Sequence, residues 1–545
     1  MQKMILRLKS YKLLSYKTAI LFSFIVFAIF IALFRYQTSL IWSSDNGLDI
    51  YVYQIIGNAW NHGVLPYKDL FDMKGPAWYM LWFVFAFISP WSNTAPFIFL
   101  IFIYTISFIF AFKILKLFLS NFASYLVSVI YIFIAFTTDC TYTGFSSSFY
   151  VEEIIYPIAL LFIYTILKDF YFKQKVNRYV YFINGVLFGF IVWSKYQLIG
   201  IWAGITFGLL IYAIGKKIKW KKLLQNMLIF LSGLALFTIF IIFVLYLNGN
   251  LRDMFRCYFF SKPGNYSLYQ IIADWPNIHD FLFYSNFLYL GSIWSILIII
   301  LLVSLFFKSP FKNFRIVIIS CFVINSFVET VLLYHPYNWQ VVFIPTIFAF
   351  IFLGYTFRKF EPKKFFKKSL AIGLSVLFLM IFYIQISVFH DDDRVSVFNE
   401  NNKMIPLYDP VMEHYLGGGE NAGKFLSEYI NLHSTDNSVF VWSYIGANYS
   451  TYFYNKQIPD NYYFFPTAMN DLLKADFDTK RIYATKKYKW VIRSIAPSKY
   501  PILDTTFTLK QLKAIFPDFY LWKNYKPVIA VNQMQFTTVL FERDD

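Results

Sequence analysis

Long apolar runs, separated by short polar or basic segments, make up most of residues 18–389. Each run is close to the roughly 20 residues with which an α-helix crosses the hydrocarbon core of a bilayer. We therefore predict that this part of the chain is a bundle of membrane-spanning helices. The twelve runs lie near residues 18–42, 76–91, 96–112, 121–136, 153–167, 179–193, 198–215, 223–247, 283–307, 316–333, 341–357 and 370–389.

The pattern changes at residue 390. The rest of the chain is more polar, and short apolar segments alternate with a helix-like stretch, as is typical of a small soluble α/β domain. The strand-like segments are residues 438–442, 490–493 and 537–541, and the helix-like one is residues 422–431. We therefore divide the chain into a transmembrane domain, residues 1–389, and a soluble α/β domain, residues 390–545.

The composition agrees with a polytopic α-helical membrane protein. Of the 545 residues, 58% are hydrophobic and 15% are charged, whereas a soluble domain carries roughly 25% charged residues. The net charge of +18 does not indicate a nucleic-acid partner, because much of it lies in short loops between the spans. This is the positive-inside pattern, and lipid is the partner it indicates. The basic loops are residues 168–178, 216–222, 308–315 and 358–368.

The basic loops and the basic N-terminus predict the orientation of the chain. We place them in the cytoplasm, so that residues 43–75 and the C-terminal domain face outward. This topology needs an odd number of crossings, but the apolar runs number twelve. A short or broken crossing within residues 139–150 would restore an odd number, and we expect about 11–13 spans in all. That remedy leaves Lys113 and Lys116 at the outer end, against the positive-inside pattern.

The first outer loop, residues 43–75, holds a cluster of charges between two apolar runs. Its members are Asp45, Asp49, Asp69, Asp72 and Lys74. Charge held at a bilayer surface is costly to desolvate, so we take the cluster as a candidate functional site. Residues 51–60 form an amphipathic stretch, and a helix lying in the membrane interface would hold Asp49 at headgroup depth.

Each residue of this loop also has a structural interpretation. Asp49 could cap the helix that follows it, and Lys74 could extend its amine to the lipid headgroups. Asp69 and Asp72 could form turns. We favour a functional role for Asp49 and Lys74 and a structural one for Asp69 and Asp72.

Three further outer positions carry polar or charged residues. They are Glu152 and Glu153 at the start of a span, Lys195 at the turn between two spans, and the loop that contains Arg252 and Arg256. Each position also has a structural alternative. Glu152 or Glu153 could be a first-turn acid that satisfies a helix dipole, and Lys195 could extend its amine to the headgroups. The loop with the arginines could be a solvated face.

Acids and cations at one membrane level suit a lipid-linked phosphate sugar. Lysine and arginine bind phosphate oxygens, whose charge grows as the phosphate departs. A carboxylate can take the proton of an acceptor hydroxyl as it attacks the sugar. The sequence shows no nucleotide, flavin or haem motif, and its three cysteines are too scattered for a zinc site; a divalent metal stays open.

Two segments resemble the first outer loop of bacterial GT-C type membrane glycosyltransferases. They are residues 49–57, DIYVYQIIG, and residues 63–76, GVLPYKDLFDMKGP. This family, glycosyltransferase family 39-like, includes protein O-mannosyltransferases and the aminoarabinose transferase of lipid A. Weaker matches are residues 152–157, the Lys195 turn, residues 334–340, residues 439–442 and residues 459–462. Where the family usually has Lys-Pro-Pro, this chain has Lys74-Gly75-Pro76.

The resemblance implies roles for individual residues. Asp49 falls on the family's catalytic base, since its spacing to Val52 and Gly57 fits better than that of Asp45. Lys74 falls on the lysine that contacts the lipid phosphate, and Glu152 or Glu153 on a second acidic position. Lys195, Arg252, Arg256 and Asn338 are our further candidates for substrate binding.

The sequence thus predicts an enzyme that transfers a sugar from a polyprenyl-phosphate donor to a glycan or protein acceptor, with inversion. It would act on the outer face of a bacterial cytoplasmic membrane. The alternatives are a polymerase of lipid-linked glycans, and a flippase or transporter of lipid-linked sugars. A transporter would favour internal symmetry and charge deep within the spans. The sequence shows no internal repeat, and Arg35 and Glu329 are the only clearly span-embedded charges.

Overall fold

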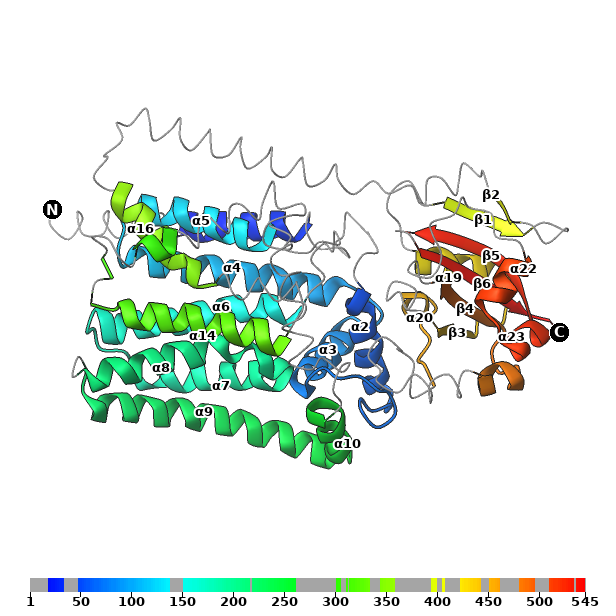
Figure 1. The fold of residues 1–545 in the computed structure, drawn as a ribbon, viewed down its shortest axis with the longest axis horizontal. Coiled ribbons are helices and arrows are strands. Elements are labelled where there is room, and N and C mark those ends of the chain that lie inside the picture. The colour runs from blue at the N-terminus through cyan, green and yellow to red at the C-terminus, as the bar shows by residue number, and fades with distance from the viewer. Residues whose placement is uncertain are drawn as a thin grey trace, which may run out of the picture. The chain divides into compact units, whose positions relative to one another are not determined.

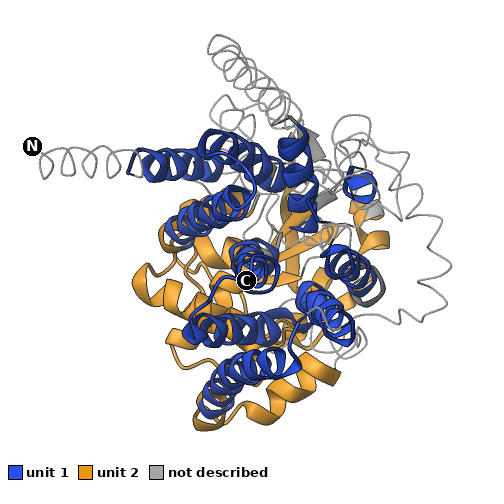
Figure 2. Cartoon of the chain, turned by 90° about the vertical axis from the view of Figure 1, so that its left-hand side faces the viewer, with its two compact units in different colours: residues 1–36, 96–243, 267–380 blue, residues 37–95, 244–266, 381–545 orange. Residues whose placement is uncertain are grey.

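The chain folds as two compact units, shown as a ribbon in Figure 1 and coloured separately in Figure 2. Unit 1 consists of Met1–Tyr36, Pro96–Phe243 and Ser267–Met380, and unit 2 of Gln37–Ala95, Val244–Tyr266 and Ile381–Asp545. The computed structural model describes residues 18–33, 48–137, 150–215, 218–260, 300–304, 310–311, 313–333, 344–357, 394–398, 404–406, 422–442, 450–460, 480–495, 509–533 and 536–544. The predicted domain boundary at residue 389 stays a prediction.

Unit 1 is a bundle of apolar helices that lie side by side (Figure 1). Its labelled helices are α4 (Thr94–Lys116), α5 (Asn121–Thr137), α6 (Val151–Ile166), α7 (Arg178–Lys195), α8 (Gly200–Ile214), α9 (Trp220–Leu247), α14 (Arg315–Leu333) and α16 (Ile347–Phe357). Among the described residues, four stretches are long and apolar enough to cross a membrane, namely Thr94–Lys116, Val151–Tyr171, Arg178–Ile214 and Trp220–Leu247. The prediction of membrane-spanning helices is thereby supported, and their total number stays open.

The stretch Arg178–Ile214 is a hairpin of two helices. α7 ends at Lys195, whose backbone angles of φ −159° and ψ 89° are not helical. The rings of Phe188 on α7 and Trp202 on α8 then lie 5.1 Å apart. In a continuous helix with a rise of about 1.5 Å per residue they would lie about 21 Å apart. The predicted turn at Lys195 is therefore confirmed.

Close backbone contact through glycines holds this hairpin to its neighbours. Gly200, Gly204 and Gly208 recur at every fourth position of α8 and face α14. A Cβ added at Gly204 would lie 2.6 Å from the carbonyl oxygen of Ser320. Small residues at this spacing allow membrane helices to approach closely, where lipid removes the hydrophobic drive for association.

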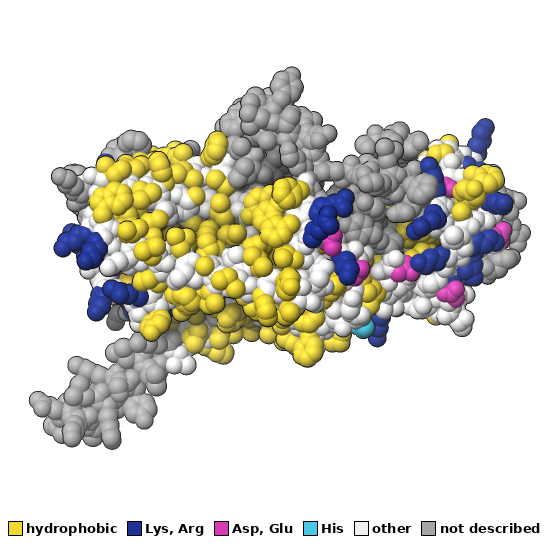
Figure 3. Space-filling view, turned by 90° about the horizontal axis from the view of Figure 1, so that it is seen from below, with side chains coloured by type: hydrophobic (Ala, Val, Ile, Leu, Met, Phe, Trp, Pro, Cys, Tyr) yellow, Lys and Arg dark blue, Asp and Glu magenta, His cyan; other side chains and the backbone are white. Residues whose placement is uncertain are grey.

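Basic side chains gather at one end of the bundle's apolar surface (Figure 3). The ring of Phe118, just after α4, lies 5.1 Å from that of Phe172 and 5.3 Å from that of Phe311. Lys113 and Lys116 close α4 and therefore lie at the same end as the basic loops 168–178 and 308–315. The prediction that placed these two lysines at the opposite end is wrong.

A buried acid ties three helices together at this basic end. Asp169 lies in the π-helical turn η1 (Leu167–Tyr171) and is only 3% exposed. Its carboxylate accepts hydrogen bonds from Tyr181 at 2.7 Å, Asn226 at 2.9 Å and Lys222 at 2.6 Å. Buried charge of this kind is tolerated because it is paired and hydrogen-bonded. Asp169 is thus a structural residue, although its loop is basic and polar in sequence.

In unit 2, α2 (Leu48–Asn61) packs against α3 (Pro76–Ile88). α3 has 13 residues, so it is about 20 Å long and falls short of the roughly 30 Å hydrocarbon core. The apolar run at residues 76–91 thus forms a helix, one that belongs to unit 2, and whether it crosses the bilayer stays a prediction. The same unit contains α10 (Leu251–Phe255) and the π-helical turn η3 (Arg256–Phe260).

The C-terminal part of unit 2 is built on a six-stranded sheet with the order β2-β1-β5-β6-β4-β3. The strands are β1 (Arg394–Phe398), β2 (Met404–Pro406), β3 (Val439–Trp442), β4 (Trp490–Ile495), β5 (Tyr525–Gln533) and β6 (Phe536–Arg543). All neighbours are antiparallel except β3 and β4, which are parallel. β3, β4 and β6 confirm the predicted strands, and β5, which contains Pro527, was not predicted.

Helices cover both faces of this sheet. Val491 and Phe541 belong to a buried cluster with residues of α22 (Leu509–Ile515) and α23 (Phe519–Asn524). Trp490, whose side chain points to the opposite face, contacts Tyr429 of α19 (Ala422–His433). This α/β arrangement agrees with the predicted make-up of the C-terminal domain.

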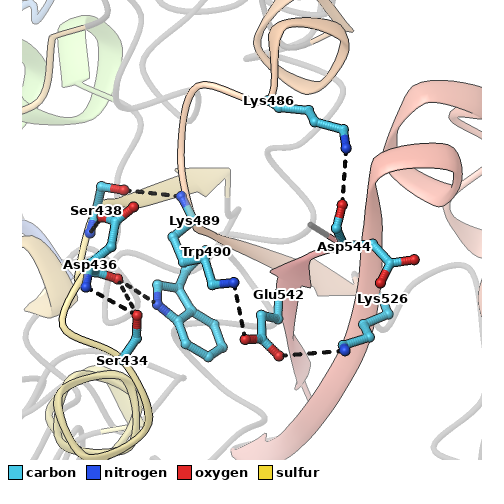
Figure 4. Close-up of polar contacts among 9 residues, drawn as sticks. All are labelled: Ser434, Asp436, Ser438, Lys486, Lys489, Trp490, Lys526, Glu542 and Asp544. Atoms are coloured by element: carbon cyan, nitrogen blue, oxygen red, sulfur yellow. Dashed lines mark hydrogen bonds and ion pairs between the residues drawn. The ribbon is translucent and has the colours of Figure 1, made fainter.

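Polar contacts fasten the strand ends of this sheet (Figure 4). Glu542 on β6 pairs with Lys489 at 3.4 Å and with Lys526 on β5 at 4.0 Å. The Trp490 indole donates a hydrogen bond of 3.0 Å to the carbonyl oxygen of Asp436. Because the lysines are partly exposed, such pairs contribute little stability each, and the buried cluster carries most of it.

The sheet domain also contacts α2 within unit 2. α20 (Ser450–Tyr454) follows β3 and packs on α2. The hydroxyls of Tyr51 and Tyr454 are 3.2 Å apart, and the rings of Tyr51 and Phe453 are 5.5 Å apart. α2 is therefore covered by α3 and by α20, elements from distant parts of the sequence.

We expect Gly204→Ala to destabilise the protein by about 1–3 kcal/mol, because overpacking forces the α8 and α14 backbones apart. The measurement is thermal unfolding of the purified protein in detergent. Phe207→Ala is the control, since Phe207 is on the same helix but 51% exposed. Equal stability of Gly204→Ala and the parent protein would contradict the close contact.

Candidate functional site

α2 starts at Leu48, within the predicted first outer loop of residues 43–75, and is surrounded by protein. Every residue from Ile50 to Trp60 is buried, so the predicted helix is confirmed but its predicted position as an amphipathic interfacial helix is not. Asp49 lies in the first turn of α2, within the helix rather than ahead of it as a cap. Its side chain lies outside the described part of the structure.

The close approach of α3 explains why α2 has a glycine at position 57. A Cβ at Gly57 would lie 2.5 Å from the carbonyl oxygen of Trp82 on α3, closer than real Cβ contacts. Glycine therefore allows α2 and α3 to meet backbone to backbone. The buried side chain of Asn58 in the same helix has two partners: it donates to the carbonyl oxygen of Gln54 at 2.8 Å and accepts from the Trp91 amide at 3.2 Å.

Between α2 and α3 the acids act as turn formers. The Asp69 carboxylate accepts a hydrogen bond of 2.8 Å from the Leu65 amide. Asp72 is 5% exposed, and its carboxylate accepts from the amide of Met73. Side-chain to backbone bonds of this kind stabilise turns. The structural interpretation of Asp69 and Asp72 is confirmed by these contacts.

Lys74 lies at the end of this loop, over an aromatic cluster. Its amine is 5.9 Å from the centroid of the Tyr53 ring, within the range of a cation–π contact. Tyr53 in turn packs edge-to-face on Trp78, with ring centroids 5.5 Å apart. The carbonyl oxygen of Lys74 accepts a hydrogen bond of 2.8 Å from the Tyr67 hydroxyl. The lysine is therefore held at its backbone and at its amine.

Tyr67 is a buried residue of the loop with an unusual backbone conformation, and it was not among the predicted site residues. It is 0% exposed and has a positive φ of 70°. Burial, and the nearby Tyr258, Asp72 and Cys257, raise the pKa of Tyr67 well above its ordinary value. The phenol therefore stays protonated and remains a hydrogen-bond donor.

The segment with the candidate arginines packs against this loop. Asn250, which is fully buried, donates a hydrogen bond of 3.1 Å to the carbonyl oxygen of Pro66. Cys257 places its thiol 4.0 Å from the carbonyl oxygen of Tyr67. Arg252 and Arg256 are on the exposed side of the same segment. Unit 2 thus brings together Lys74 and the elements that carry Asp49, Arg252 and Arg256.

The remaining predicted residues lie in unit 1. Glu152 and Glu153 begin α6 and are each 2% exposed. Glu152 forms a buried ion pair with Lys195 at the end of α7. Glu153 accepts a hydrogen bond of 3.2 Å from the hydroxyl of Tyr104 on α4. Lys195 is thus buried and paired, so the alternative of a lysine extending to headgroups does not apply. Asn338 lies outside the described residues.

Unit 1 therefore joins three helices at the end opposite the basic loops. A buried pair is stable only when both charges are present, because an unpaired charge keeps its desolvation cost.

No group of three His, Cys, Asp or Glu side chains that could hold a metal ion occurs among the residues that the structure describes.

Comparison with known proteins identifies the fold. A scan against protein-family models and a search of curated proteins both find no match. The structure is similar to the crystal structure of ArnT from Cupriavidus metallidurans bound to undecaprenyl phosphate, with a TM-score of 0.52 and 10% sequence identity. The match covers 96% of this chain and 98% of that one. The GT-C type fold that the first outer loop indicated is thereby confirmed for nearly the whole chain.

We expect Glu152→Gln to destabilise the protein by about 3–5 kcal/mol, because it leaves the Lys195 ammonium buried without its counter-charge. The double variant Glu152→Gln, Lys195→Met should lose less stability than the sum of the two single variants. Thermal unfolding in detergent measures both quantities. Lys175→Met, at an exposed loop lysine, is the control. Additive losses would show that the pair is not coupled.

Proposed function

We propose that this chain is an integral membrane glycosyltransferase that uses a polyprenyl-phosphate sugar as donor. The observation that carries the proposal is the fold shared with ArnT over 96% of the chain, together with the loop-one motif that matches the same class. ArnT was crystallised with undecaprenyl phosphate, so a lipid of this kind is the donor carrier that we propose. The sugar and the acceptor, a glycan or a protein, are open.

Asp49 is our candidate for the general base. In the proposed reaction an acceptor oxygen attacks the anomeric carbon of the sugar while the Asp49 carboxylate takes the proton of that oxygen. The bond between the anomeric carbon and the phosphate oxygen breaks, which inverts the anomeric configuration. The lipid phosphate leaves with the bonding electrons and gains negative charge.

Lys74 is our candidate for stabilising this charge. Its amine lies over the Tyr53 ring, a contact that restricts the side chain and lowers the entropy lost when an anion binds. Arg252 and Arg256, exposed on the segment that packs on the same loop, are candidates for further phosphate contacts. Glu152, Glu153, Lys195 and Asn338 remain candidates for substrate binding, with the Glu152–Lys195 pair already neutral as a unit.

The chemistry is proposed for the outer face of a bacterial cytoplasmic membrane, with eleven crossings. Leaving α3, which belongs to unit 2, out of the twelve predicted apolar runs gives eleven, an odd number. No extra crossing in residues 139–150 is then needed. The same count returns Lys113 and Lys116 to the cytoplasmic side, in agreement with their position beside the basic loops and with the positive-inside pattern.

We expect Asp49→Asn to lower sugar transfer by at least about 100-fold without changing thermal stability, because an amide cannot accept the proton. The assay incubates the purified protein with defined polyprenyl-phosphate sugars and follows donor consumption. Asp69→Asn is the matched control, since the amide oxygen can still accept from the Leu65 amide and Asp69 has no proposed role in transfer. Retained transfer in Asp49→Asn, or an equal loss in Asp69→Asn, would refute the assignment.

The proposed topology predicts the labelling of a cysteine at residue 116. In intact cells, Lys116→Cys should not react with a membrane-impermeant maleimide, whereas it should react after permeabilisation. Lys523→Cys on exposed α23 should react in both conditions. The parent protein measures the background from its own three cysteines, of which Cys257 and Cys321 are buried. Labelling of Lys116→Cys in intact cells would contradict the count of eleven.

A further inference from the structure

We propose that Tyr67 is a positioning residue that fixes Lys74 in place for contact with the lipid phosphate. This inference rests on the proposed function, because it needs Lys74 to bind the donor. Tyr67 itself is fully buried and would act through the lysine rather than by touching the substrate.

The backbone of Tyr67 is held in a conformation that the residue would not adopt alone. A φ of 70° is unfavourable for a bulky side chain, and such strain persists only where the surroundings over-determine it. The Tyr67 amide donates to the carbonyl oxygen of Leu70 at 2.8 Å. Asn250 holds the preceding carbonyl group, that of Pro66. The strain is thus maintained by contacts on both sides of the residue.

The side chain of Tyr67 is equally constrained. Its ring packs edge-to-face on Tyr79 of α3, with centroids 5.7 Å apart. Its hydroxyl crosses the loop and donates to the carbonyl oxygen of Lys74, seven residues later, at 2.8 Å. Because burial and the neighbouring groups raise the pKa of this phenol, the donor is present at every physiological pH.

This hydrogen bond holds the carbonyl group of Lys74 at the point where the loop enters α3. Gly75, the N-cap of α3, follows Lys74, and Pro76, the first residue of α3, has no amide proton. The Tyr67 hydroxyl therefore sets the backbone from which the Lys74 side chain reaches the Tyr53 ring. Pre-organisation of this kind lowers the entropy lost on binding an anion.

The same residue links Lys74 to the segment with the candidate arginines. Met254, Cys257 and Tyr258 are the buried side of residues 251–260, and Arg252 and Arg256 are on its exposed side. Cys257 contacts the carbonyl oxygen of Tyr67. A change in the position of Tyr67 would therefore disturb both Lys74 and the segment that carries Arg252 and Arg256.

The test uses the full-length purified protein in detergent and undecaprenyl phosphate as the probe, with affinity measured by calorimetric titration. Tyr67→Phe keeps the ring and removes one hydrogen bond, so we expect about three- to tenfold weaker binding. The matched control is Tyr131→Phe in unit 1, where an equally buried hydroxyl donates to the carbonyl oxygen of Ile344 at 3.0 Å. The control should leave binding unchanged although it also loses a buried bond.

A double-mutant cycle with Lys74→Met separates positioning from general structure. If Tyr67 acts through Lys74, adding Tyr67→Phe to Lys74→Met causes no further loss of affinity. Asn250→Ala, which releases the Pro66 carbonyl group, should show the same non-additivity and gives a second variant if the first unfolds. Multiplicative losses in both cycles would overturn the inference.

The outcomes also distinguish this inference from the proposed function. If Lys74→Met weakens binding and Tyr67→Phe does not, the positioning role is refuted and the role of Lys74 stands. If Lys74→Met leaves the affinity unchanged, the proposed phosphate contact fails and the positioning role fails with it. Equal weakening by Tyr67→Phe and Tyr131→Phe would show a general effect of lost stability and would also refute the inference.

Discussion

The close approach of α2 and α3 at Gly57 is the contact on which the outer loop depends. Because the two backbones nearly touch there, residues 62–75 must reverse the chain direction within a short distance, so that α3 runs back beside α2. The approach also assembles the aromatic cluster under Lys74, with Tyr53 from α2 and Trp78 from α3. A larger residue at position 57 would separate the helices and open the cluster, however well the loop itself were formed.

Buried charged side chains in the helix bundle likewise depend on close partners. α6 is fastened at its start by Glu152 to Lys195 on α7, and beyond its end by Asp169 to Lys222 on α9. Apolar surface cannot give a membrane helix a unique neighbour, since lipid is equally apolar. Paired charges and glycine contacts supply that specificity here, and they explain how acids can lie buried in a chain of 58% hydrophobic residues.

Local patterns in the sequence predicted much of the fold, and failed where distant contacts decide. The α2 helix, the Lys195 turn and strands β3, β4 and β6 follow from periodicity and turn residues. The burial of α2 could not be predicted, because the partner α20 lies about 400 residues later, as Tyr51 and Tyr454 show with a separation of 403. The pairing of Glu152 with Lys195 and the role of Tyr67 likewise depend on tertiary contacts.

The strand order of the C-terminal sheet has a consequence for biosynthesis. Its two central strands, β5 and β6, are the last in the sequence, while β1 and β2 at one edge are the first. The sheet therefore cannot close until β6 has been synthesised, and pairings this distant form slowly. α20, which joins the sheet through β3, can only then become a firm neighbour of α2. The helix that carries Asp49 is therefore synthesised long before the neighbours that complete its surroundings.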